Sequence, residues 1–149
     1  LVSTKLFDVL FTPMISPELA EKVGGIHEPK DVLKVPLLDP RDEWWIIWFK
    51  AHGLPLEALE HQTSPTFNMM TLDAEAAMAG MGITLLMPEY FQRELDQGRL
   101  IMPFDRLVDE DSGYWLAYPE GRRNVPKIRH FRDWIVAEAA SGKFRPSGR

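Results

Sequence analysis

The residues best suited to bind a small molecule lie at the start of a predicted helix from Met69 to Ala79. A helix N-terminus exposes amide N–H groups and carries about half a unit of positive charge, which suits an anion. Polar and apolar side chains meet at this point, namely Phe67, Asn68, Met69, Met70 and Thr71. The residues alone leave two interpretations open, an anion-binding site or a helix that Asn68 simply caps.

The sequence carries no recognisable catalytic or metal-binding pattern. It has no cysteine, which excludes disulfides, thiolate nucleophiles and cysteine-ligated zinc. No two histidines lie four residues apart, and no HExxH, GxSxG, GxGxxG or P-loop motif occurs. The acidic residues near Asp109 lack the spacing of an EF-hand, so a solvated loop is favoured. We therefore predict no catalytic residue, no metal site and no cofactor, and an enzyme using a histidine or this loop is the least favoured function.

Composition and charge narrow the function classes further. The chain has 149 residues, of which 45% are hydrophobic and 26% charged, as in a globular domain. Its formal net charge of −5 argues against nucleic-acid binding by this segment. The longest apolar run, 44–49, is far shorter than the roughly 20 residues that a membrane span needs. No signal-peptide pattern occurs either, so we expect no membrane partner and a cytoplasmic location.

Helix and strand signals alternate along the chain. Strands are predicted over 5–14, 35–38, 83–87, 100–104 and 114–118, and helices are predicted to begin at Ser16, Asp39, Met69, Pro88 and Asn124. The apolar run 83–87 is continuous, as in a buried parallel strand. This alternation indicates an α/β domain with a largely parallel or mixed sheet.

The predicted helix that ends at Gly53 is unusually aromatic. Trp45, Trp48 and Phe49 share one face at spacings of three and four residues, and Trp44 extends the apolar surface. Such a helix is either deeply buried or contacts something besides its own core. We favour a core or interface helix over a ligand platform.

Six sequence blocks form a pattern when they are taken together. They are LFDVLFTPMISPELA at 6–20, WxxWFxxxGL from Trp45, FN with EAAMAGMGI from Phe67, GRL with PF from Gly98, YWLAYP from Tyr114 and FRDWI from Phe131. In this order, over about residues 5 to 140, they resemble the effector-binding domain of LysR-type transcriptional regulators. The resemblance is greatest to the glycine-cleavage activator-like subgroup.

The resemblance implies a fold like that of type-2 periplasmic binding proteins, with two α/β lobes, two crossing strands and a small effector between the lobes. It makes 1–13 a crossing strand from lobe I and 14–113 the whole of lobe II. It makes 114–140 the return strand and terminal helix of lobe I, and 141–149 a flexible tail. We expect the family's DNA-binding helix-turn-helix and the first part of lobe I to be absent from this chain.

The resemblance also implies which residues contact the effector, and these are Thr12, Phe67, Asn68, Met69, Met70, Thr71 and Tyr114. The family often has Asp, Ser and Ser at positions 69–71, so this chain lacks two polar side chains there. A partly apolar carboxylate could still bind through the backbone amides. Ile46 and Ile47 replace residues that are usually polar in the family, which hints at a contact surface.

The implied function is regulation without catalysis. Effector binding would close the lobes and rearrange a homo-oligomer, and DNA would be contacted only through the absent helix-turn-helix. The alternative is a solute-binding protein of a transporter with the same fold.

Overall fold

The chain folds into two compact units in a computed structural model that describes residues 1–105 and 107–142, without the side chains of 107, 108, 110 and 111. Unit 1 contains Leu1–Leu10 and the chain from Val108 onward, and unit 2 contains Phe11–Leu107. The long strand β1 (Val2–Met14) contributes to both units.

A three-stranded sheet has the order β2-β1-β3, where β2 is Thr84–Leu86 and β3 is Leu107–Tyr118. In unit 2, β2 pairs antiparallel with β1, with Thr12 opposite Leu86. The strand predicted over 83–87 is therefore confirmed, but its expected parallel orientation is wrong for its pairing with β1. Among the residues that the structure describes in this region, parallel pairing is limited to one bridge, between Leu37 and Ile83.

Two predicted strands of unit 2 are reduced to single bridges. The segment 35–38 contributes Leu37 alone, and 100–104 contributes Ile101, which bridges antiparallel to Ile15. The backbone bonds at these points are well formed, since the Ile101 amide donates to the Ile15 carbonyl at 2.9 Å. These bridges hold two loops against the sheet.

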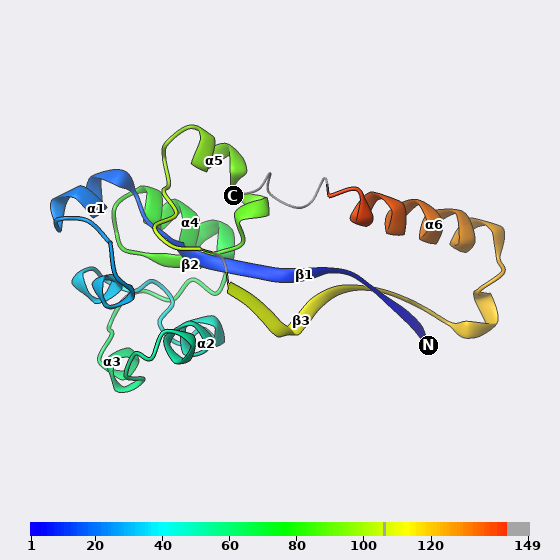
Figure 1. The fold of residues 1–149 in the computed structure, drawn as a ribbon, viewed down its shortest axis with the longest axis horizontal. Coiled ribbons are helices and arrows are strands. Elements are labelled where there is room, and N and C mark those ends of the chain that lie inside the picture. The colour runs from blue at the N-terminus through cyan, green and yellow to red at the C-terminus, as the bar shows by residue number, and fades with distance from the viewer. Residues whose placement is uncertain (106, 143–149) are drawn as a thin grey trace. The chain divides into compact units, whose positions relative to one another are not determined.

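In unit 2, short helices lie around β2 and the adjoining end of β1, and α4 lies beside β2 (Figure 1). They are α1 (Pro17–Lys22), η1 (Pro29–Lys34), α2 (Glu43–Ala51), α3 (Glu57–Glu60), α4 (Met70–Met78), η2 (Pro88–Tyr90) and α5 (Gln92–Asp96). Ser16 caps α1 as predicted, because its hydroxyl accepts from the Leu19 amide at 3.2 Å. The helix expected to open at Asp39 begins later, since Asp42 is the residue that accepts from the Trp44 amide, at 2.9 Å.

The core of unit 2 centres on the aromatic face of α2. Trp45, Trp48 and Phe49 are at most 1% exposed and meet in edge-on or tilted ring contacts with centroids 5.9 to 6.0 Å apart. Trp45 Nε1 also donates to the Leu38 carbonyl at 3.0 Å. The interpretation of this helix as a core element is therefore confirmed.

Unit 1 buries much less. It contains the outer half of β1, most of β3, η3 (Glu120–Arg122) and α6 (Pro126–Ala140). In α6, Ala139 is buried, but Phe131 remains 51% exposed. The flexible tail predicted over 141–149 lies outside the described residues from position 143 onward.

The helices can also be compared with the thickness of a membrane. Among the residues that the structure describes, no helix combines the length and apolar character that a membrane span requires.

Candidate functional site

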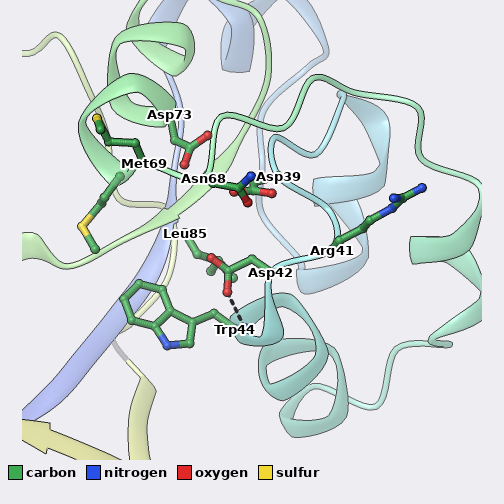
Figure 2. A pocket seen from close by; sticks show the side chains of 9 residues that line it. Asp39, Arg41, Asp42, Trp44, Asn68, Met69, Asp73 and Leu85 are labelled. Atoms are coloured by element: carbon green, nitrogen blue, oxygen red, sulfur yellow. Dashed lines mark hydrogen bonds between the residues drawn. The ribbon is translucent and has the colours of Figure 1, made fainter.

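A cavity of about 370 Å³ lies in unit 2 at the start of α4 (Figure 2). Its volume is within the range of small-molecule sites. The loop before α2, the loop before α4 with the first turn of that helix, and β2 together form its wall. The lining residues are Asp39, Arg41, Asp42, Trp44, Asn68, Met69, Met70, Asp73 and Leu85.

The first turn of α4 opens towards this cavity without a side-chain cap from any described residue. Met69 is the N-cap, and its carbonyl accepts from the amides of Leu72 and Asp73 at 3.0 Å each. The amides of Met70 and Thr71 precede these bonds, so helix geometry gives them no partner within α4. Asn68 adopts a left-handed conformation with φ of 52° and is not the cap, which removes one of the two interpretations of this residue.

The residues predicted to contact an effector are distributed unevenly around the cavity. Asn68, Met69 and Met70 line it. Phe67 and Met70 pack against a core cluster of unit 2, so they also anchor the loop and first turn. Thr71 is exposed and is not among the lining residues.

Thr12 and Tyr114, the two predicted contacts on strands, do not line this cavity. Thr12 is fully buried in unit 2, and its hydroxyl lies 3.1 Å from the Phe104 carbonyl and 3.2 Å from the Asp105 carbonyl. Tyr114 belongs to unit 1, where its ring stacks on Phe7 with centroids 4.5 Å apart. In their own units, both side chains have a structural role.

Three aspartates that the sequence did not single out as ligands converge on the cavity. Asp39 and Asp73 are buried, at 7% and 6% exposure, and Asp42 lies at the cap of α2. The carboxylates of Asp42 and Asp73 point into the same space, whereas Arg41 extends away from it (Figure 2). Among the described residues, the ion pairs do not include Arg41, so the cavity wall carries uncompensated negative charge.

Burial and mutual repulsion change the pKa values of the aspartates that line the cavity. Burial raises the pKa of Asp73 to about 6, and repulsion by Asp39 and Asp42 adds to the rise. Burial also raises the pKa of Asp42 above its ordinary value, and the hydrogen bond from the Trp44 amide opposes that rise. Asp73 Oδ1 is buried and, within the described part of the chain, has no hydrogen-bond partner.

One wall of the cavity is aromatic and rigid. The Trp44 ring stacks on Phe11 of β1 with centroids 4.7 Å apart and planes 4° from parallel. Phe11 is fully buried, so the indole is held in place by the core. The aromatic character of this helix was evident from the sequence. The sequence did not indicate that Trp44 lies outside the ring cluster of the core and faces a cavity.

The chemistry of this site is that of binding. Within the described residues, no group of three or more histidines and acidic side chains is placed to hold a metal ion. The cavity offers helix amides, three carboxylates, an asparagine amide and apolar side chains, which together can orient a small polar molecule.

Comparison with known proteins identifies the family of the chain. The sequence profile of the LysR substrate binding domain matches residues 1–140. The chain belongs to this family. Members of the family are transcriptional regulators, so the recognition made from the sequence blocks is confirmed.

Curated relatives of this LysR-family chain include transcriptional activators. The transcriptional activator AmpR of Enterobacter cloacae is 34% identical over 131 residues, which cover 83% of this chain and 41% of AmpR. The glycine cleavage system transcriptional activator of Escherichia coli K12 is 30% identical over 144 residues, covering 95% of this chain and 47% of the activator. The chain thus spans about half the length of these relatives.

Solved structures confirm the fold class. The effector domain of AmpR from Pseudomonas aeruginosa has a TM-score of 0.77 and 29% identity, covering 95% of this chain and 66% of that one. The AmpR effector-binding domain from Citrobacter freundii has a TM-score of 0.75 and 28% identity, covering 94% and 68%. These domains have the periplasmic-binding-protein-like α/β fold that the sequence blocks implied.

Proposed function

We propose that this chain is the effector-sensing part of a LysR-type transcriptional regulator and that the cavity at the start of α4 contacts the effector. The observation that carries the proposal is that Asn68, Met69 and Met70, expected as effector contacts from the family pattern, line a cavity of suitable size. The free amides of Met70 and Thr71 would receive a carboxylate or another acceptor group of the ligand.

The wider action of the protein follows from the same proposal. An effector that favours one arrangement of the lobes shifts the population of a homo-oligomer towards that arrangement. DNA would be contacted by a helix-turn-helix outside this chain, which is consistent with the net charge of −5 here. A regulator of this type acts in the cytoplasm. The transporter alternative gains no support, because the relatives compared are regulators.

Two exposed methionines flank α4 and allow a matched test. Met69 is 55% exposed and lines the cavity, whereas Met81 is 45% exposed and lies beyond the other end of the helix. Met69→Trp would fill the cavity mouth, and Met81→Trp adds the same bulk elsewhere.

The measurement is a reporter assay with the regulator that contains this chain. We expect Met69→Trp to abolish induction by the effector while operator occupancy persists, and Met81→Trp to respond as the parent does. Full induction of the Met69→Trp regulator would contradict the proposed site.

A further inference from the structure

The charge of the cavity indicates what kind of ligand it takes. We propose that the ligand presents a positively charged nitrogen, an ammonium or guanidinium group, to the carboxylates of Asp39, Asp42 and Asp73. This inference rests on the proposed function, because it names the chemistry of a ligand at the same site. The three aspartates line one cavity of about 370 Å³, and two of them are buried.

The strongest observation is the state of Asp73. Its side chain is 6% exposed, and its Oδ1 atom has no hydrogen-bond partner among the described residues. A buried carboxylate oxygen without a partner is costly, and native structures leave few of them. The Asp73 side chain points into the cavity in Figure 2, so a donor on a bound ligand would approach its carboxylate from the cavity.

The described residues that line the cavity do not supply the missing positive charge. Arg41 is the basic residue of the cavity wall, and its side chain is directed away from the carboxylates (Figure 2). The raised pKa of Asp73 and Asp42 has the same origin, since each carboxyl is at least partly shielded from water and faces other negative charges. A cationic ligand would compensate the negative charge of the cavity and would lower the pKa of both carboxyl groups.

A metal ion does not fit this role. The described acidic side chains form no group that could coordinate one ion together. Carboxylates that share a cavity without converging on a single point suit an organic cation, whose several N–H donors reach acceptors in different directions. Met70 lines the same cavity, so a ligand can place an acceptor group at its amide and its cationic nitrogen towards Asp73.

A matched set of four-carbon probes separates charge from shape. The probes are butylammonium, butanoate, butan-1-ol and 2-aminobutanoate, which are titrated into the ¹⁵N-labelled chain at pH 7.5 while backbone amide shifts are recorded. We expect butylammonium and 2-aminobutanoate to shift the amides of 68–73 and 39–42. Their apparent Kd should be at least about tenfold lower than that of butan-1-ol, which forms only neutral hydrogen bonds, and than that of butanoate, which the carboxylates repel. Calcium chloride should leave these amides unchanged.

Variants then assign the effect to the aspartates. Asp73→Asn should raise the Kd of butylammonium about tenfold or more and leave that of butan-1-ol unchanged. Glu75→Gln, which removes an exposed carboxylate from the same helix, should have no effect on either probe. Asp42→Asn provides a second cavity variant at a more exposed position, in case Asp73→Asn alters the fold.

The outcomes distinguish this inference from the proposed function. If butanoate or butan-1-ol binds these amides as tightly as butylammonium, the cationic ligand is excluded and the effector site stands. The inference is also overturned if neither aspartate variant weakens butylammonium, or if none of the probes shifts these amides. The reporter assay with Met69→Trp then decides separately whether the cavity is the effector site.

Discussion

The Asp73 carboxylate contributes to stability in a way that depends on pH. Its pKa is about 6 in the folded chain, against an ordinary value of 3.8. Between these pH values the folded state binds more protons than the unfolded state. The free energy of unfolding is therefore highest at low pH and falls as the pH rises. At about 1.4 kcal/mol per pH unit, the ionised group costs up to about 3 kcal/mol above pH 6.

Asp73→Asn should therefore stabilise the ligand-free chain in neutral and alkaline solution. We expect a gain of about 1 to 3 kcal/mol at pH 8, which declines between pH 6 and pH 4 because the folded parent then becomes neutral at this position. Urea unfolding across that pH range measures the gain. Glu75→Gln is the control on the same helix, and parallel pH profiles for the parent and Asp73→Asn would contradict the account.

At the residue scale, the sequence singled out three residues that line the cavity and missed the aspartates that also line it. Asn68, Met69 and Met70 could be found because they adjoin a helix start, which is a local signal. Asp73 is far in the sequence from Asp39 and Asp42, and Asp39 was interpreted as the start of a helix. Their convergence depends on the pairing of Leu37 with Ile83 and on the position of α4 beside β2, which no local pattern encodes.

At the scale of elements, α2 connects the core to the site. Its inner face of Trp45, Trp48 and Phe49 fixes the helix, and Trp44 at its first turn then faces the cavity. The sequence predicted this burial because four aromatic residues within six positions exceed what a surface helix exposes. The start of the helix was predicted too early, because Asp39 and Asp42 are both suitable caps and only the fold selects Asp42.

The loop from α4 to β2 shows a similar limit. Gly80 and Gly82 lie between α4 and β2, and Gly80 has the positive φ of 79° that a helix end favours. Gly82 has a second role, since a Cβ there would lie 2.3 Å from the Pro36 carbonyl oxygen. This close approach permits the bond from the Ile83 amide to the same carbonyl, at 2.9 Å. A tertiary contact of this kind leaves no signature in the sequence.

Substitutions on opposite faces of α2 should differ sharply in their effect. Phe49→Ala should lower the free energy of unfolding by about 3 to 5 kcal/mol, because it leaves a cavity among fully buried rings. Ile46→Ala is the matched change on the outer face, where the side chain is 36% exposed, and it should cost less than about 1 kcal/mol. Chemical denaturation monitored by tryptophan fluorescence measures both, and similar losses would show that the outer face is also packed.

At the scale of the whole molecule, the two units differ in how much they bury. Unit 2 contains nearly all of the fully buried side chains, among them Phe11, Leu37 and Trp48. Among the described residues of unit 1, burial is limited to Val9, Asp109, Tyr118 and Ala139. Since buried apolar area is the main source of stability, the two units should open with different free energies.

Hydrogen exchange of the backbone amides tests this difference directly. The amides of α6 should exchange at least about 100-fold faster than those of α2 and α4, because α6 buries Ala139 but leaves Trp134 55% exposed. Phe49→Ala should accelerate exchange in α2 and α4, whereas Trp134→Ser should leave both helices unchanged. If α6 were as protected as α4, its exposed apolar face would have to be covered in solution, and the mass of the chain by light scattering would show whether a second copy covers it.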